Sequence, residues 1–95
     1  MNIGSAIKVI RKQKGLSQKD LAKKVNLSVN GLSLIETNAS FPQKTTINAI
    51  CQALDIPVSY LLFFSISEED IPDDRKITFN SLNQAIKAVL LSDIK

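Results

Sequence analysis

Two short polar side chains, Asn30 and Ser33, have the chemistry that recognition of nucleic-acid bases requires. An asparagine amide can form two hydrogen bonds with adenine, and a serine hydroxyl can bond either a base or a phosphate. The neighbouring Val29 and Leu34 could contact only the methyl group of thymine. All four lie in residues 28–36, which the spacing predicts to be a short helix offered to solvent or to a DNA groove.

The residues that enzymes most often use for proton transfer or metal binding are scarce. The chain has no histidine and one cysteine, so the usual zinc sites and an intrachain disulfide are excluded. Cys51 follows Ile47 and Ile50 and precedes Leu54, which predicts a thiol on a buried helix face and not a reactive one. We therefore expect no catalytic residues, no metal and no cofactor.

The helix at residues 28–36 is the second of a predicted two-helix unit. Two apolar pairs at helical spacing give each helix one apolar face: Leu21 with Val25, and Leu32 with Ile35. Ser17 and Ser28 stand at the N-cap positions, and Asp20 follows Ser17 by three residues, where a carboxylate favours the helix dipole. Asn26 lies between the pairs and tolerates the left-handed conformation of a sharp turn. Two such helices make a helix-turn-helix.

Length and composition allow one small domain. The 95 residues include 44% hydrophobic residues, which is typical of a globular protein. At this size only about two-thirds of the unfolded surface is buried, so one core must stabilise the chain. No stretch is apolar enough to span a bilayer, and residues 1–15 lack the apolar block of a signal peptide. We expect a cytoplasmic protein that does not bind a membrane.

The net charge of +3 is unevenly distributed along the chain. Residues 1–64 contain eight Lys and Arg against three acids, which gives +5, whereas residues 65–95 contain four bases and six acids, which gives −2. This division indicates a basic working surface followed by a segment with another task.

Helices are also predicted on both sides of the two-helix unit. The first covers residues 3–14 and stops at Gly15, which suits a C-terminal cap. After a loop that contains Pro42, a helix starts at residue 43 or 44 and runs to 54, and a short helix covers residues 57–62. Their expected core residues are Ile3, Ala6, Ile7, Ile10, Ile47, Ile50, Cys51, Leu54, Val58, Leu61 and Leu62.

The chain resembles the Cro/phage-repressor family of helix-turn-helix regulators, also called the XRE family. The resemblance lies in GLSQKDLAKKVNLSVNGLSLIE, in Pro42 six residues after Glu36, and in ALDIPVSYLL, and it covers about residues 7–62. It implies an all-α fold: a five-helix, lambda-repressor-like domain that usually acts as a dimer on a near-palindromic operator in double-stranded DNA.

Carried over residue by residue, the resemblance also implies a DNA-binding site. Gln18 would contact a phosphate, Thr37 and the backbone around Asn38 would form a phosphate-binding loop, and the outward positions of residues 28–36 would reach base edges. Leu34 could instead pack against neighbouring protein. The expected DNA-binding residues are Gln18, Lys19, Ser28, Val29, Asn30, Ser33, Leu34, Thr37, Asn38 and Lys44.

Arg11 and Glu36 match a pair that is buried and ionised in several phage repressors. Each is the charged residue of its helix nearest to the apolar stripe. We therefore expect an ion pair between them.

The sequence departs from the family pattern at several positions. Asn26 and Asn38 stand where the family often has glycine, and asparagine also reaches the left-handed conformation. Gly31 lies inside the second helix of the unit, where glycine costs about 1 kcal/mol. Gln43 stands where some phage repressors have an arginine for the minor groove, which leaves Lys44 as the nearby cation.

Residues 65–95 lie outside the resemblance and follow a domain that ends at residue 64. An acidic connector, with a helical turn opened by Ser67, precedes an amphipathic helix. Its apolar stripe is Leu82, Ala85, Ile86, Val89 and Leu90. The stripe could cover its own domain, a second copy or another partner. We expect the second copy, with a dimer interface at Leu82, Ile86, Val89 and Leu90.

These observations predict a dimeric, sequence-specific DNA-binding repressor that acts by occupying its operator. The alternative from another class is an antitoxin-like inhibitor, whose C-terminal segment binds a protein target while the N-terminal domain regulates its own operon.

Overall fold

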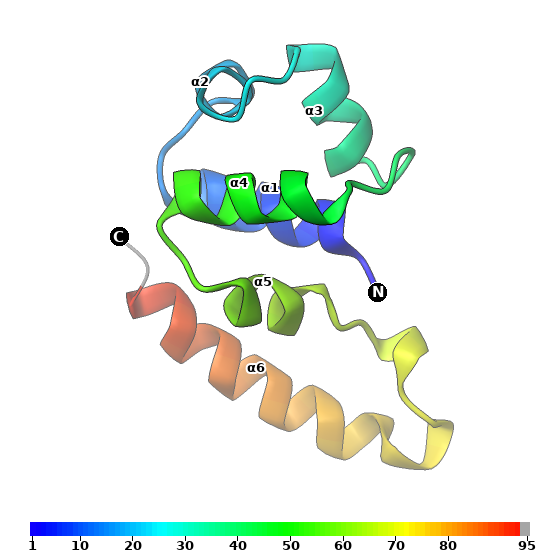
Figure 1. Ribbon diagram of the computed structural model, residues 1–95. Helices are drawn as coiled ribbons and strands as arrows, with labels where there is room; N and C mark the ends of the chain where they lie inside the picture. The colour runs from blue at the N-terminus through cyan, green and yellow to red at the C-terminus, as the bar shows by residue number, and fades with distance from the viewer. Residues whose placement is uncertain (94–95) are drawn as a thin grey trace.

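The computed structural model describes residues 1–93, which form an all-helical fold (Figure 1). The elements are α1 (Ile3–Gln13), α2 (Gln18–Lys24), α3 (Val29–Glu36), α4 (Lys44–Leu54), α5 (Val58–Ser65), the short 3-10 turns η1 (Glu68–Asp70) and η2 (Asp73–Arg75), and α6 (Lys76–Asp93). The predicted fold class, a five-helix domain with a C-terminal helical extension, is confirmed.

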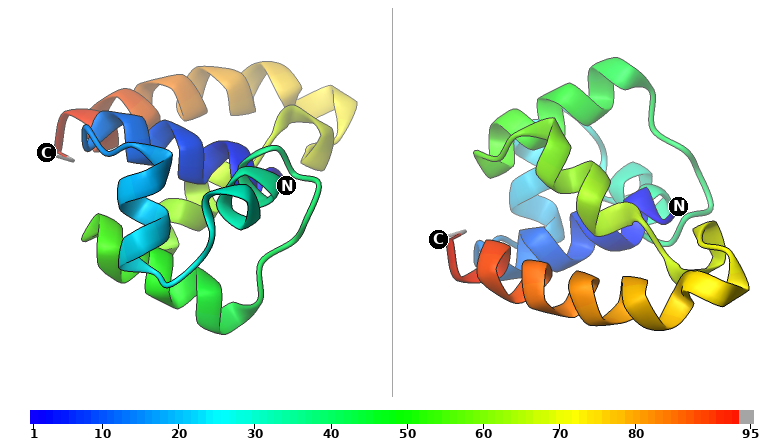
Figure 2. Two further views of the ribbon diagram at one scale, coloured as in Figure 1. Left: turned by 90° about the horizontal axis from the view of Figure 1, so that it is seen from above. Right: turned by 90° about the horizontal axis from the view of Figure 1, so that it is seen from below.

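The core forms around the apolar face of α1. In Figure 2, α1 lies between α6 on one side and α3 with α4 on the other. The large apolar side chains that are almost completely removed from solvent come from five helices and are Ile7, Ile10, Leu21, Leu32, Ile50, Leu54 and Leu61. In this core α3 packs against α1, and α2 packs against α3 and α4, so the two helices of the helix-turn-helix are held by their neighbours.

The starts of α2 and α3, and the turn between these helices, have the features that the sequence predicts. The hydroxyl of Ser17 accepts a hydrogen bond from the Asp20 backbone N–H at 3.0 Å, and the hydroxyl of Ser28 accepts one from the Gly31 N–H at 2.9 Å. Asn26 adopts the left-handed conformation, with φ of 59°. A Cβ atom at Gly31 would lie 3.0 Å from the Ser28 hydroxyl, so the glycine leaves room for this cap.

The prediction for α5 was wrong at its end. The helix continues to Ser65, Leu62 is 40% exposed, and Phe64 is buried instead. Residues 60–64 of α5 are all apolar, so spacing alone could not identify the inward face. The structure places Leu61 and Phe64, which are three residues apart, toward the core.

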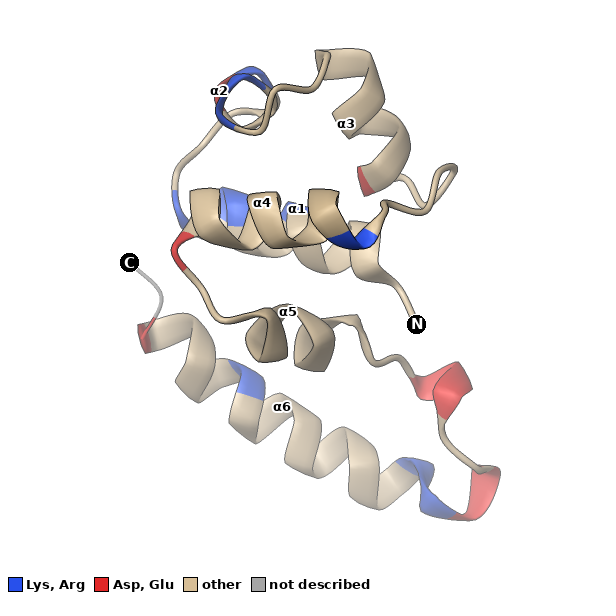
Figure 3. Ribbon diagram, viewed as in Figure 1, with Lys and Arg blue, Asp and Glu red and all other residues tan. Residues whose placement is uncertain are grey.

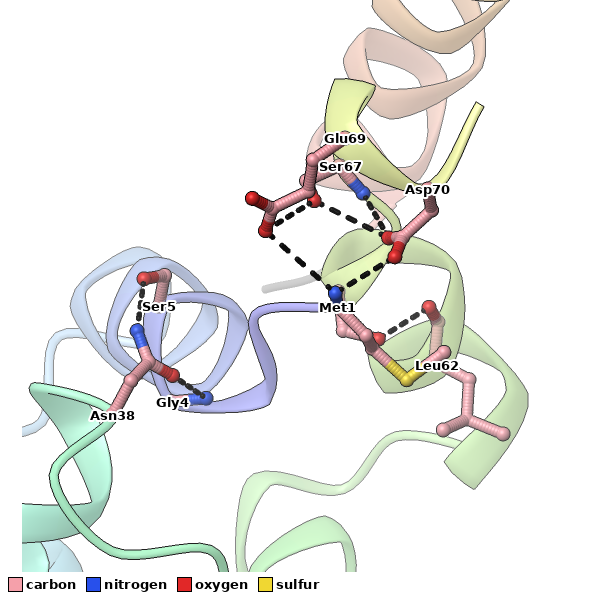
Figure 4. Close-up of polar contacts among 9 residues, drawn as sticks. Met1, Gly4, Ser5, Asn38, Leu62, Ser67, Glu69 and Asp70 are labelled. Atoms are coloured by element: carbon pink, nitrogen blue, oxygen red, sulfur yellow. Dashed lines mark hydrogen bonds and ion pairs between the residues drawn. The ribbon is translucent and has the colours of Figure 1, made fainter. Parts of the chain in front are cut away.

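The start of α1 and the end of α3 approach each other closely at Gly4. The Oδ1 atom of Asn38 accepts a hydrogen bond from the Gly4 N–H at 3.1 Å, and its Nδ2 atom donates to the Ser5 hydroxyl at 3.1 Å (Figure 4). A Cβ atom at Gly4 would lie 1.9 Å from the backbone oxygen of Ile35. Only glycine allows this contact without a shift of the backbone.

Replacing Gly4 by alanine should therefore lower the free energy of unfolding by roughly 3 kcal/mol, the upper part of the range for overpacking. Urea denaturation followed by circular dichroism measures this loss. Gly31→Ala is the matched control, because the new methyl group meets only the end of the flexible Ser28 side chain. We expect a net change of less than about 1 kcal/mol for the control, because a gain of about 1 kcal/mol in helix propensity offsets a weakened Ser28 cap. Equal effects at both glycines would contradict the importance of this contact.

The connector and α6 lie on the far side of α1 from α3 (Figure 2). The predicted helical turn is present as η1, capped by Ser67. The amine of Met1 lies 2.9 Å from the Asp70 carboxylate and ties the start of the chain to this turn (Figure 4). Hydrogen bonds from the Ser67 backbone and from this amine hold the pKa of Asp70 below its ordinary value.

Within one chain, α6 does not bury its apolar stripe as a unit. Leu82, Ile86 and Val89 are 58%, 43% and 65% exposed, and only Leu90 of the expected interface packs against the core. The helix is rotated so that Phe79, Asn83 and Lys87, among others, face the rest of the domain. The apolar stripe therefore stays largely uncovered.

By length and composition, no single helix within residues 1–93 could cross a membrane, although α4 and α5, bent by 106°, reach that threshold together. Both helices contribute several buried residues to the core of the domain.

Candidate nucleic-acid interface

The carboxylate of Glu36, at the end of α3, connects three helices. The expected ion pair with Arg11 of α1 is present: Nε donates to Oε2 at 2.7 Å and Nη2 donates to Oε1 at 3.1 Å. Gln18, at the start of α2, donates from Nε2 to Oε1 at 2.9 Å. Arg11 also donates from Nη1 to the carbonyl oxygen of Leu16 at 2.8 Å, in the turn between α1 and α2. This network fixes α2 and α3 against α1.

The Arg11–Glu36 ion pair is buried, so its loss should strongly lower the stability of the fold. The Arg11 side chain is 8% exposed and the Glu36 side chain is 1% exposed. A buried carboxylate needs hydrogen bonds to most of its lone pairs, and Glu36 has three. The two donors from one guanidinium also fix its orientation.

Gln18 is not an ordinary exposed residue in the first turn of α2. It is half-buried, and one N–H of its amide is engaged by Glu36. A side-chain amide has two N–H donors and a carbonyl acceptor, so the second N–H remains able to donate to a phosphate. The same residue can thus orient α2 and bind DNA.

The outward side of α3 presents a mixed surface. Asn30 is exposed, and Val29 and Leu34 are 45% and 44% exposed. Ser33 is half-buried beside them. Leu32 and Ile35, on the opposite side of the helix, are buried in the core. The structure therefore brings the four expected base-contacting residues to the solvent-facing side of one helix.

The loop after α3 is held by hydrogen bonds within the chain. The Thr37 hydroxyl donates to the carbonyl oxygen of Ser33 at 3.0 Å and is also 3.2 Å from that of Leu34. Asn38 has φ of 63°, and its side chain is bound to α1. The Thr37 hydroxyl oxygen can still accept, but a bond from its proton to a phosphate would require a rotation. Asn38 thus has a structural role that the sequence did not reveal.

Basic side chains frame α2 and α3. Figure 3 shows Lys and Arg on α2 and at one end of α4. Lys19 is exposed in α2, and Lys44 is exposed at the first residue of α4. Ser28 is exposed, and its oxygen already accepts from α3, which leaves its proton to donate. At the start of α2, hydrogen bonds from the side chain and backbone of Ser17 hold the pKa of Asp20 below its ordinary value. The carboxylate of Asp20 therefore carries a negative charge in the first turn of this helix.

One exposed aromatic residue was missed by the sequence interpretation. Phe41 is 72% exposed in the loop between α3 and α4, beside the buried Pro42. A large apolar side chain between polar loop residues is the signal that could have identified it.

Cys51 is buried at 2% exposure, and burial raises the pKa of its thiol. A raised pKa keeps the thiol protonated and weakly nucleophilic. Within residues 1–93, no three His, Cys, Asp or Glu side chains gather in a way that could hold a metal ion.

The five helices, the capped turn and the exposed side of α3 define a helix-turn-helix domain. The family model described as "Helix-turn-helix" matches residues 7–61, more than half of the chain, and the chain belongs to this family, in its Cro/phage-repressor type. Over its whole length it is 34% identical to the immunity repressor protein of Bacillus phage phi105. The match covers 63% of that protein, so the chain spans less than two-thirds of this relative's length.

Proposed function

We propose that this protein is a sequence-specific, double-stranded DNA-binding repressor that acts in the cytoplasm. Its chemistry would be recognition and occupancy, not catalysis. In this account, α3 enters the major groove, Asn30 and Ser33 bond base edges or nearby phosphates, and Val29 and Leu34 contact thymine methyl groups. Gln18, Lys19, Ser28, Thr37, the backbone at Asn38 and Lys44 contact phosphates.

The observation that carries the proposal is the hydrogen-bond network that joins Glu36 to Arg11 and Gln18 on the inner side of α3. Base readout needs a helix held at a defined angle, because side chains must meet base edges within hydrogen-bond distance. Arg11 and Gln18 hold Glu36 from the interior, and the opposite side of α3 is left to solvent. The similarity to a phage immunity repressor supports the same reading.

We further propose that the repressor is a homodimer that covers its operator. The uncovered stripe on α6 supports a contact with a second copy, because burial of apolar area is favourable by about 25 cal/mol per Å². The α6 helix lies across α1 from α3 (Figure 2), so this contact leaves the DNA-facing side of α3 free. Two domains held together would then read the two halves of a near-palindrome.

Replacing Asn30 by alanine should relax base preference at one position of the bound site. The loss of two hydrogen bonds to adenine should weaken binding to the preferred duplex by roughly 1 to 3 kcal/mol, with little effect on random duplex. Fluorescence anisotropy with both duplexes at one fixed salt concentration measures the difference.

Lys19→Ala is the matched control for this measurement. A phosphate contact carries no sequence information, so this change should weaken both duplexes to the same extent. If Asn30→Ala also weakened both duplexes equally, Asn30 would not be a base-reading residue.

A further inference from the structure

A cavity of about 340 Å³ lies between α6 and the rest of the domain. Residues of α1, α5, the connector and α6 line it. Phe64, from α5, and Phe79, from α6, supply aromatic walls, and Ala6 and Val9 of α1 add aliphatic surface. Nothing in the proposed recognition of DNA uses this cavity.

One polar atom in the cavity wall lacks a partner. The Oδ1 atom of Asn83 is buried, and it has no hydrogen-bond partner within residues 1–93. A buried acceptor without a donor is unfavourable, because it has lost its hydrogen bonds to water. Asn83 lines the cavity, so a rotation of its side-chain amide would present this oxygen to a molecule inside, which could supply the missing donor.

A cation lies one helical turn beyond Asn83. Lys87 also lines the cavity and is half-buried, and its Nζ atom lies 5.6 Å from the centre of the Phe64 ring. An ammonium group beside an aromatic wall combines a positive charge with a flat apolar surface. Glu68 lines the cavity too, and its carboxylate would disfavour a ligand with several negative charges.

The orientation of α6 about its axis turns the polar side chains of Asn83 and Lys87 toward the domain, which suggests that they bind something there. Stability alone would favour turning the apolar stripe toward the domain, yet Leu82, Ile86 and Val89 are exposed. Asn83 and Lys87 face the cavity in their place. The same side of α6 also carries Phe79 and Leu91, so polar groups and apolar surface meet in this cavity, as they do in small-molecule binding sites.

We propose that this cavity binds a small organic acid with a flat apolar body and one N–H or O–H donor. The carboxylate pairs with Lys87, the apolar body lies against Phe64 and Phe79, and the donor bonds to Asn83 Oδ1. The site is separate from the DNA-facing residues, so its test does not depend on the proposed function.

The experiment titrates indole-3-acetate, which has an aromatic ring, one carboxylate and one N–H donor, into the ¹⁵N-labelled full chain. We expect saturable amide shifts in residues 64–68 and in α6. Lys87→Met should weaken binding at least tenfold, whereas Lys23→Met, an exposed lysine of α2, should leave it unchanged. Indole, which lacks the carboxylate, should bind at least tenfold more weakly than indole-3-acetate.

A second comparison isolates Asn83. The probe 1-naphthaleneacetate keeps the carboxylate but has no N–H donor, so the wild-type protein should prefer indole-3-acetate several-fold. Asn83→Leu should remove that preference. The proposal is overturned if indole-3-acetate gives no saturable shifts at millimolar concentration, if the shifts lie away from α6, or if Lys87→Met binds as well as the wild type.

Discussion

Replacing Glu36 by alanine should lower the free energy of unfolding by about 3 to 5 kcal/mol. The change leaves the Arg11 guanidinium buried without its carboxylate and removes the acceptor of Gln18. A loss of this size is a large fraction of the stability of a small domain. Chemical denaturation followed by circular dichroism measures it.

Two controls separate this effect from a general response to losing a charge. Asp73→Ala breaks the pair with Lys76, but Asp73 is 97% exposed, so the change should be less than about 1 kcal/mol. The double replacement of Arg11 by methionine and Glu36 by leucine should recover much of the loss, because no buried charge is left unpaired. If Glu36→Ala cost no more than Asp73→Ala, the network would not hold the domain together.

Replacing both Leu82 and Val89 by lysine should convert the proposed dimer into a monomer. Both residues are exposed in the single chain, so the substitutions should leave its helical content unchanged. Each half-site contact would then be made independently, and affinity for a full operator should fall by about 10² to 10⁴-fold. Sedimentation and DNA titration measure the two effects.

The matched control places the same two charges elsewhere on α6, by Gln84→Lys with Ala88→Lys. These residues are exposed and lie outside the expected interface, so the protein should remain a dimer. A wild-type protein that sediments as a monomer would contradict the dimer. In that case the stripe would be better explained as a surface for a different protein, as in the antitoxin-like alternative.

Local signals in the sequence were sufficient for the helix-turn-helix. Ser17 and Ser28 cap α2 and α3, and Asn26 makes the turn, because each effect acts over three or four residues. The ion pair of Arg11 with Glu36 could be anticipated from the family resemblance and from the position of each residue near an apolar stripe.

Features that depend on two distant segments could not be predicted. Gly4 is required only because the end of α3 approaches it, and nothing near Gly4 in the sequence indicates that contact. Leu62 was expected in the core in place of Phe64 because residues 60–64 are all apolar, so their spacing does not identify the inward side. The orientation of α6 about its own axis could not be predicted. An apolar stripe indicates which side of a helix should be covered, but it does not say whether its own domain or another molecule covers it.

Selection of bound duplexes from a random DNA pool tests the central proposal most directly. The full chain, at fixed salt concentration, should enrich one near-palindromic site whose half-sites are centred about one helical turn, roughly 10 base pairs, apart. The Asn30→Ala protein should enrich a related site with relaxed preference at one position of each half. Retention of duplexes without any enriched sequence, or no retention at all, would contradict a sequence-specific repressor.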